Sequence, residues 1–276
     1  GKTTMLMSIM RLLPASGRIT AGNVYFRGND LLALSEREMR NHRWKDMAII
    51  FQGAMNALNP VMKIGDQIRE AILLHNLMER AAAEQRVGEL LELVGIPRLR
   101  RDQYPHQYSG GMRQRAMIAM ALACSPDLLF ADEPTTALDV MIQAQVLELL
   151  KEIQKKLGLA IVLVTHDLGV VAEMCDTVVV MYGGKVAEYG TAELVYNQPQ
   201  HPYTQRLLES FPDLNRSTDA SEGQDLATIP GTPPRLNALP PGCRFSPRCH
   251  KSMEVCTQIA PNLVDMSADS GVRHLA

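Results

Sequence analysis

Short apolar runs alternate along roughly the first 195 residues with segments whose apolar positions recur every three or four residues. This alternation predicts a parallel β-sheet wrapped by helices, an α/β fold. Each run is nearly continuous in apolar residues, as expected for strands that are buried on both faces. The predicted strands are Met47–Gln52, Asp127–Ala131, Leu159–Thr165 and Thr177–Tyr182.

Helical spacing is clearest between Val140 and Leu157, and Gly158 follows it as a helix stop. The segment between the first two predicted strands has a different pattern of apolar positions. Between about residues 66 and 124, apolar side chains recur in two helical runs, and the second run ends at Gly95-Ile96-Pro97. We therefore predict an inserted, mainly helical subdomain in this range.

Proline marks a third region, because most of the sixteen prolines lie at Pro199 or later. The segment Pro230-Gly231-Thr232-Pro233-Pro234 is incompatible with a regular helix or a central strand. We predict a first domain over 1–197 and a separate, small, loop-rich C-terminal region over 198–276 that contains cysteines.

Composition narrows the class of protein. The chain has 276 residues, of which 46% are hydrophobic and 21% charged, and this balance is typical of a folded globular protein. The apolar runs are strand-sized and fall short of the ~18–20 residues that a membrane-spanning helix needs. The formal net charge of −2 provides no basic footprint for bulk nucleic-acid binding.

The first residues, Gly1-Lys2-Thr3, match the end of the P-loop pattern G-x-x-x-x-G-K-[ST]. In that loop, backbone N–H groups cradle phosphate, the lysine reaches the β- and γ-phosphates, and the hydroxyl binds Mg²⁺. The tripeptide alone is a weak signal. Because the chain begins partway through the motif, we expect it to be a fragment that by itself binds ATP poorly.

Further polar groups follow predicted strands or precede a helix. Asp132 and Glu133 end an apolar strand, where one carboxylate suits Mg²⁺ and the other suits a water aimed at the γ-phosphate. The alternative is an acidic helix cap before Pro134. His166 follows another strand, and its alternative is an ordinary boundary histidine. Gln52 directly follows a strand, and its alternative is an ordinary strand-end glutamine. Ser109-Gly110-Gly111 precedes a helix whose N-terminus suits phosphate, and its alternative is a helix cap at Ser109.

Taken in order along the chain, these motifs resemble the nucleotide-binding subunit of an ABC transporter, a P-loop NTPase-type fold, over residues 1 to about 195. The set that carries the resemblance is Gly1-Lys2-Thr3, Gln52, Ser109-Gly110-Gly111, Asp132-Glu133, Thr136-Ala137-Leu138-Asp139 and His166. Tyr108 and Met112 stand where the family often has leucine and glutamine.

The resemblance implies a role for each matching residue. Glu133 would be the catalytic base of an ATPase, His166 the switch histidine and Gln52 the residue that senses nucleotide and touches membrane subunits. The glycines of Ser109-Gly110-Gly111 would contact ATP held by a partner subunit. The implied ATP-binding residues are Gly1, Lys2, Thr3, Thr4, Gln52, Ser109, Gly110, Gly111, Asp132 and Asp139, with Thr3, Gln52 and Asp132 at Mg²⁺.

The tail resembles the C-terminal region of the oligopeptide/dipeptide importer ATPases, through His201-Pro202-Tyr203-Thr204, Pro230–Pro234 and Gly242–Cys249. This subfamily implies a second ABC ATPase, two permease subunits and an extracytoplasmic solute-binding protein as partners. It also implies a peripheral position at the cytoplasmic face of the membrane. Nickel, glutathione or sugars are alternative solutes, and a soluble ABC ATPase acting on nucleic acid or ribosomes is a different class of function.

Cys243, Cys249 and Cys256 are separated by five and six residues. Some members of the subfamily ligate a [4Fe-4S] cluster with three such cysteines and a fourth. Here His274 stands at about the place of the fourth, and three cysteines with one histidine would also suit tetrahedral zinc. Three reduced thiols in a small core are the remaining interpretation. Cys124 and Cys175 are expected to be small core residues.

Overall fold

The computed structural model describes residues 1–53, 57–136, 138–210, 228–267 and 273–276. The chain divides into two compact units, one formed by Thr3–His166 and the other by Gly1, Lys2 and Asp167–Ala276. Within the described residues, no helix combines the length and the apolar character that crossing a membrane requires. The predicted domain boundary at residue 197 stays a prediction.

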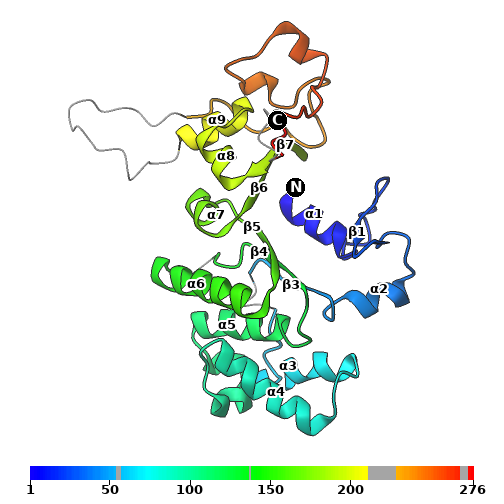
Figure 1. Ribbon diagram of the computed structural model, residues 1–276, viewed down its shortest axis with the longest axis vertical. Coiled ribbons are helices and arrows are strands. Elements are labelled where there is room, and N and C mark those ends of the chain that lie inside the picture. Colours follow the sequence, from blue (N-terminus) through cyan, green and yellow to red (C-terminus); the bar gives the residue numbers. More distant parts are fainter. Residues whose placement is uncertain (54–56, 137, 211–227, 268–272) are drawn as a thin grey trace, which may run out of the picture. The chain divides into compact units, whose positions relative to one another are not determined.

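A three-stranded parallel sheet forms the centre of the first unit (Figure 1). Its strands are β3 (Met47–Ile50), β4 (Leu128–Asp132) and β5 (Ala160–Val164), in the order β3-β4-β5. The register pairs Ile50 with Ala131 and Asp132 with Val164. Because all three strands run the same way, the residues that follow them meet at one edge of the sheet. The predicted α/β class is confirmed.

Apolar side chains of the sheet and its helices form the core of this unit. Long helix α6 (Val140–Leu157) has the predicted bounds and ends at Gly158, whose φ of 63° is the left-handed conformation that glycine tolerates. Helix α1 (Lys2–Ile9) buries Leu6 against the sheet residue Phe130. Between these elements lie β1 (Tyr25–Phe26), β2 (Asn29–Asp30) and α2 (Glu36–His42).

Helices occupy the range where the sequence spacing predicts them. Helices α3 (Ile64–Leu74), α4 (Arg80–Leu93) and α5 (Gly110–Ala121) pack together at one end of the first unit (Figure 1). Short 3-10 turns at Arg98–Asp102 and Pro105–Gln107 connect α4 to α5. Many apolar positions of these helices are almost fully buried, including Ile68, Ile72, Val87, Leu90, Leu91 and Ile118.

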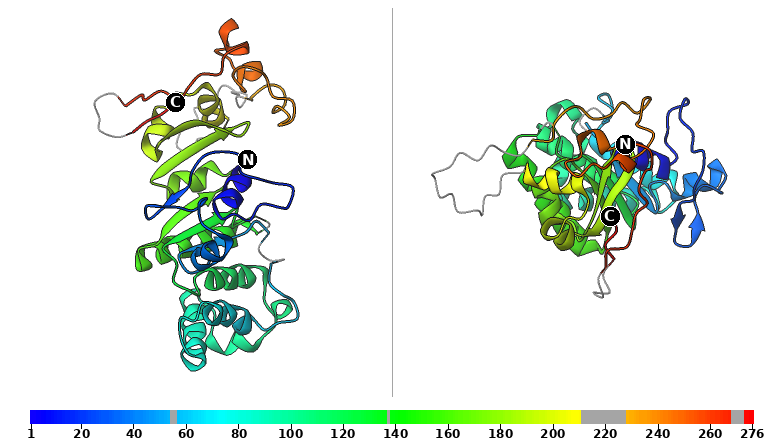
Figure 2. Two further views of the ribbon diagram at one scale, coloured as in Figure 1. Left: turned by 90° about the vertical axis from the view of Figure 1, so that its right-hand side faces the viewer. Right: turned by 90° about the horizontal axis from the view of Figure 1, so that it is seen from above.

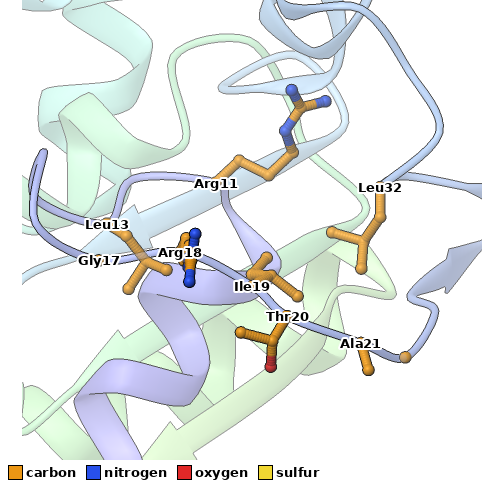
Figure 3. Close-up of a pocket in the computed structure, with 9 residues that line it drawn as sticks. Arg11, Leu13, Gly17, Arg18, Ile19, Thr20, Ala21 and Leu32 are labelled. Atoms are coloured by element: carbon orange, nitrogen blue, oxygen red, sulfur yellow. The ribbon is translucent and has the colours of Figure 1, made fainter.

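A cavity of about 450 Å³ lies beside the segment that follows α1 (Figure 3). The guanidinium of Arg11, which lines this cavity, donates hydrogen bonds to the carbonyl oxygens of Leu34 (2.6 Å) and Leu31 (3.3 Å). These bonds hold the neighbouring turn. The cavity is lined by Arg11, Leu13, Gly17–Gly22 and Leu32. Since none of these is a predicted nucleotide-binding residue, the cavity does not mark the candidate site.

The second unit contains a two-stranded antiparallel sheet of β6 (Thr177–Tyr182) and β7 (Lys185–Thr191). The predicted strand Thr177–Tyr182 is present, but its partner among the described residues runs antiparallel, not parallel. The reason is the two-residue turn Gly183-Gly184, whose φ values of 55° and 83° produce the hairpin geometry that suits the twist of the strands. Helices α7 (Leu168–Met174), α8 (Ala192–Asn197) and α9 (Pro202–Glu209) complete this part.

Residues in or beside the tail segments join one aromatic cluster of the second unit, namely Tyr203, Ile229, Cys243, Phe245 and Cys249. Figure 2 shows the backbone of these segments in yellow to orange. Tyr203 of α9 and Phe245 of the cysteine-containing loop both contact Tyr182 of β6, with ring centroids 4.6 and 5.0 Å apart. Arg248 donates to the carbonyl oxygens of Pro230 (2.7 Å) and Ile229 (3.1 Å), which anchors the proline-rich segment beside the same cluster.

A buried carboxylate, Glu188 of β7, joins two further segments of this unit. It is 0% exposed and accepts hydrogen bonds from the backbone N–H groups of Gln200 (2.8 Å) and His201 (3.1 Å). It also meets Nε2 of His274 at 2.7 Å, and the neighbouring Leu275 pairs with Tyr189 in a β-bridge. Through these bonds the carboxylate holds the C-terminal segment and the start of α9 on β7.

The imidazole of His201 caps α9, because its Nδ1 accepts a hydrogen bond of 3.0 Å from the N–H of Tyr203. An accepting Nδ1 must be unprotonated. Burial lowers the pKa of His201, an effect that nearby Glu188 partly offsets, and the lowered pKa keeps that nitrogen unprotonated near neutral pH.

Replacing Glu188 with alanine should destabilise the second unit by about 3–5 kcal/mol, because it leaves the buried imidazole of His274 and the backbone N–H groups of Gln200 and His201 without their acceptor. The exposed Glu209, paired with Arg206 on α9, is the matched control, and Glu209→Ala should cost less than ~1 kcal/mol. Hydrogen exchange of β7 amides during urea unfolding of the full-length protein measures both changes.

The double variant Glu188→Ala/His274→Ala should lose less stability than the sum of the two single variants, because each single change already removes the same interaction. Strict additivity of the two losses would contradict the role given to this pair.

Candidate nucleotide site

The predicted phosphate-binding residues open a helix. Lys2 is the first residue of α1, and Gly1, Lys2, Thr3 and Thr4 are all exposed. Backbone N–H groups at a helix start have no partner within the helix and favour anions. The hydroxyl of Thr3 donates a 3.2 Å hydrogen bond to Oδ1 of Asp132, so the Gly1-Lys2-Thr3 motif and the end of β4 meet.

The carboxylate of Glu133 gathers three other side chains at the end of β4. Its Oε2 accepts hydrogen bonds from Nε2 of Gln52 (2.8 Å) and from the hydroxyl of Thr136 (2.9 Å). Its Oε1 lies 3.3 Å from Nδ1 of His166. Gln52, Glu133 and His166 are far apart in sequence, and the parallel sheet brings them together because each follows a strand.

The backbone of Glu133 is strained. Its φ of 46° is left-handed, a conformation that costs a non-glycine residue on the order of 1–3 kcal/mol. The cost is greater here because Pro134 follows, and a residue before proline is pushed towards extended conformations. The N–H of Glu133 donates to the carbonyl of Val164 (2.8 Å), and this bond to β5 holds the strained residue in place.

Exposure differs across the cluster in a way that suits catalysis. The side chain of Glu133 is 17% exposed, whereas that of His166 is 74% exposed and Asp132 is 2% exposed. Asp132 is therefore buried, and His166 is the most exposed of these three side chains.

The segment before α5 is stiff. Ser109 caps α5, because its hydroxyl oxygen accepts from the N–H of Met112 (3.3 Å). Tyr108, which stands where the family often has leucine, is 2% exposed and donates its hydroxyl to the carbonyl of Arg100 (3.0 Å). Burial raises the pKa of Tyr108 to about 12, so the phenol keeps that proton. Arg113 donates to the carbonyls of Pro105 and Tyr108, and these bonds fix the turn that precedes α5.

Two residues that the sequence reasoning did not assign to the site emerge from this geometry. Thr136 belongs to a quoted motif, but only the fold shows that it holds Glu133. Arg113 lies in the first turn of α5 as a positioning cation for the Ser109 turn. Its signal in the sequence is no more than an arginine after a glycine pair. Asp139 caps α6 through the N–H of Ile142 (3.0 Å), and its predicted contact with nucleotide stays a prediction; Ala137 lies outside the described residues.

The residues present fit Mg²⁺. Thr3 and Asp132 direct a hydroxyl and a carboxylate oxygen at one another, and Mg²⁺ prefers oxygen ligands of these kinds. These two residues would hold the ion together with oxygens of a nucleotide. Gln52, the third predicted ligand, directs its amide nitrogen at Glu133, and its contact with Mg²⁺ stays a prediction.

The three tail cysteines lie in one loop system of the second unit. The N–H of Cys243 donates to the carbonyl of Cys256 (2.8 Å), and a Cβ on Gly242 would lie only 2.3 Å from that same oxygen. Glycine at 242 is thus required for this close approach. Burial is the main reason that the pKa of Cys249 is raised, and the neighbouring thiols of Cys243 and Cys256 add to it.

The predicted four-residue metal site is not assembled. Among the described residues, which include all four candidates, no group of three or more His, Cys, Asp or Glu side chains forms a metal site. The Nε2 of His274 meets the buried carboxylate of Glu188 at 2.7 Å. The structure therefore gives no support for a zinc or iron–sulfur site at Cys243, Cys249, Cys256 and His274.

Family models match both parts of the chain. Residues 1–136 match the model described as ABC transporter, and residues 187–256 match the one described as oligopeptide/dipeptide transporter, C-terminal region. The dipeptide transport ATP-binding protein DppD of Bacillus subtilis is 53% identical over 95% of this chain and 77% of its own length. The oligopeptide transport ATP-binding protein OppD of Salmonella typhimurium is 48% identical with the same coverage.

Solved structures agree with this assignment. The ATP-binding cassette MJ0796, in a dimeric post-hydrolysis state bound to ADP and Pi, superposes with a TM-score of 0.61 at 28% identity. The match covers 70% of this chain and 81% of that one. CbiO1 of Clostridium perfringens, part of an ABC transporter complex, has a TM-score of 0.62, also at 28% identity, with 72% and 75% covered. The chain therefore belongs to the ABC transporter family of ATP-binding proteins.

Proposed function

We propose that this chain is the ATP-hydrolysing subunit of an importer that takes up di- and oligopeptides. The observation that carries the ATPase role is the strained Glu133, whose carboxylate collects Gln52, Thr136 and His166 directly after Asp132. The peptide substrate rests on the C-terminal region and on relatives whose names refer to dipeptide and oligopeptide transport. Nickel, glutathione and sugars remain the alternative solutes.

Hydrolysis by these residues depends on position and charge more than on covalent chemistry. Lys2 and the start of α1 would bind the phosphates, and Thr3 with Asp132 would hold Mg²⁺, which neutralises phosphate charge when bound. The carboxylate of Glu133 would orient the attacking water and accept its proton. His166, at 3.3 Å from that carboxylate, would donate towards the γ-phosphate.

The Ser109 turn is proposed to act on a neighbouring subunit. Ser109, Gly110 and Gly111 stand at the start of α5, where free N–H groups favour phosphate. In the proposed dimer the Ser109 turn of each chain contacts the ATP that is bound by its partner. MJ0796, to which this chain is similar, has been solved as a dimer.

The remaining partners follow from the importer assignment. A second ABC ATPase, identical or related, would pair with this chain, and two membrane permease subunits would carry the solute. Gln52 and the helices α3 and α4 would face those permeases. An extracytoplasmic solute-binding protein would deliver the peptide, and the chain would sit at the cytoplasmic face of the membrane as a peripheral subunit. Co-purification with permeases, as opposed to ribosomes or nucleic acid, tests this set.

Glu133→Gln should lower ATP turnover of the full-length protein by about 100-fold or more, the lower range of general-base contributions. The amide keeps the size of the side chain but does not accept the proton, so the ATP-bound dimer should accumulate. Steady-state hydrolysis and gel filtration with ATP measure the two effects. The control is Glu148→Gln on the exposed face of α6, which should change neither. Undiminished turnover in the Glu133 variant would refute its role.

Ser109→Asp and Ser109→Asn separate capping from the action on a partner's ATP. Both side chains cap helices well, and the aspartate also suits the helix dipole, so stability should be retained in each. The added negative charge should repel the partner's γ-phosphate. We expect ATP-dependent pairing to weaken by about tenfold for the aspartate, equivalent to ~1.4 kcal/mol, with a much smaller change for the asparagine. Equal pairing of the two variants would place Ser109 away from the partner's nucleotide.

A further inference from the structure

A two-glycine turn of the second unit lies against the first residue of the P-loop motif. Gly183 and Gly184 join β6 to β7, and both have left-handed φ values. A Cβ placed on Gly1 would lie 3.8 Å from Cα of Gly184, which leaves room for little more than a methyl group between the two backbones. Gly1 belongs to the same compact unit as this turn. The turn therefore borders the segment that is proposed to bind phosphate.

A single side chain of the cysteine-containing loop, Arg244, packs along this turn. Its Nη1 donates a hydrogen bond to the carbonyl of Gly183. A Cβ placed on Gly183 would lie 3.2 Å from Cδ and 3.3 Å from Cβ of Arg244. A Cβ placed on Gly184 would lie 3.4 Å from Nη1. The stem and the guanidinium of Arg244 thus lie close to both glycines.

Arg244 is held by the residues on either side of it. The N–H of the preceding Cys243 donates to the carbonyl of Cys256 (2.8 Å). The following Phe245 is 2% exposed and packs on Tyr182, with ring centroids 5.0 Å apart. Because Tyr182 directly precedes the two-glycine turn, the tail loop holds this part of the chain at two neighbouring points, through ring packing and through the hydrogen bond of Arg244.

The position of Gly1 matters for phosphate. In the P-loop pattern that Gly1-Lys2-Thr3 completes, backbone N–H groups bind the phosphates, and such hydrogen bonds weaken steeply when their geometry is lost. A turn of two glycines has much conformational freedom, because glycine lacks the Cβ that restricts the backbone. The bond from Arg244 to the carbonyl of Gly183 restricts that freedom. Support of the turn is therefore also support for the phosphate-binding backbone beside it.

We propose that Arg244 is a positioning residue for the phosphate-binding segment. It holds the Gly183-Gly184 turn against Gly1, so that the tail contributes to the affinity of this subunit for nucleotide. The proposal rests on the proposed function, in which Lys2 and the start of α1 bind the phosphates of ATP. It assigns Arg244 no contact with nucleotide and no part in the attack of water at Glu133.

The test replaces Arg244 with methionine, which keeps an apolar stem but has no cation and no hydrogen-bond donor. Isothermal titration of the full-length protein measures Kd for Mg-ATP and for Mg-ADP. We expect both Kd values to rise about three- to tenfold, the range that one hydrogen bond covers. The rise should be equal for the two nucleotides, because the P-loop backbone binds the α- and β-phosphates that they share. At saturating ATP, kcat should change by less than about twofold, since the groups around Glu133 are untouched.

Arg248→Met is the matched control. Arg248 belongs to the same loop and also donates to backbone carbonyls, but these are the carbonyls of Ile229 and Pro230, outside the two-glycine turn. Both Kd values should stay unchanged in this variant, even if the tail loses stability. Arg244→Lys keeps a cation and a donor on a long stem. Because one nitrogen of Arg244 meets the carbonyl, lysine should keep both Kd values within about twofold of the original.

Gly184→Ala provides a second variant for the case that a methionine at 244 impairs folding. Its Cβ meets Nη1 of Arg244, and a φ of 83° is strained for alanine, so the change disturbs the same turn and leaves the aromatic cluster intact. Both Kd values should rise in this variant as well.

Three outcomes would overturn the inference. The first is unchanged affinity for both nucleotides in the Arg244→Met and Gly184→Ala variants, with only a lower melting temperature, which would describe a purely structural arginine. The second is a loss of affinity for ATP alone, which would indicate direct contact with the γ-phosphate. The third is an equal loss of affinity in Arg248→Met, which would indicate general loosening of the tail.

Lys2→Ala in the same titration keeps the two proposals distinct. If Lys2→Ala loses nucleotide while Arg244→Met binds it normally, only the positioning role of Arg244 fails. If Lys2→Ala itself binds nucleotide normally, the proposed phosphate site fails, and the role of Arg244 fails with it.

Discussion

The candidate site depends on how β4 ends. Asp132 is the last residue of a buried strand, and the next residue turns into a left-handed conformation that a side chain before proline strongly disfavours. The conformation persists because the N–H of Glu133 is bound to β5 through Val164. A further backbone bond runs from the N–H of Thr136 to the carbonyl of Glu133 (3.1 Å), and the carboxylate meets Gln52, Thr136 and His166. The sheet thus stabilises the strained backbone of Glu133 at the point where its charged side chain must be placed accurately.

The second unit follows a related principle with a different purpose. Glu188 is fully buried, and its oxygens are satisfied by two backbone N–H groups and an imidazole. Such a carboxylate is costly to bury, so its value lies in specifying which segments meet. It joins β7 to the start of α9 and to the C-terminal segment, while Tyr182, Tyr203 and Phe245 supply the apolar packing nearby. The tail motifs are consequently parts of one small core.

Polar side chains that bind backbone recur in both units. Arg11, Arg113, Arg248 and Gln67 each hold a loop by donating to its carbonyl groups. Loops near a site need such support, because they have no ladder of hydrogen bonds of their own. In the turn Asn59–Met62 the support comes from the side chain of Gln67 in α3.

The sequence by itself determined the class of fold and most of the candidate site. Periodicity predicted α6 with its bounds and the strands that lead to Gln52, Asp132 and His166, because buried strands and amphipathic helices leave local patterns. The order of motifs identified the family. Three features were decided only by the tertiary structure: the antiparallel pairing of β6 with β7, the bond from Thr136 to Glu133, and the commitment of His274 to Glu188. Each of these contacts depends on how the chain folds, and the spacing of residues along a sequence does not show which groups become neighbours in the folded protein.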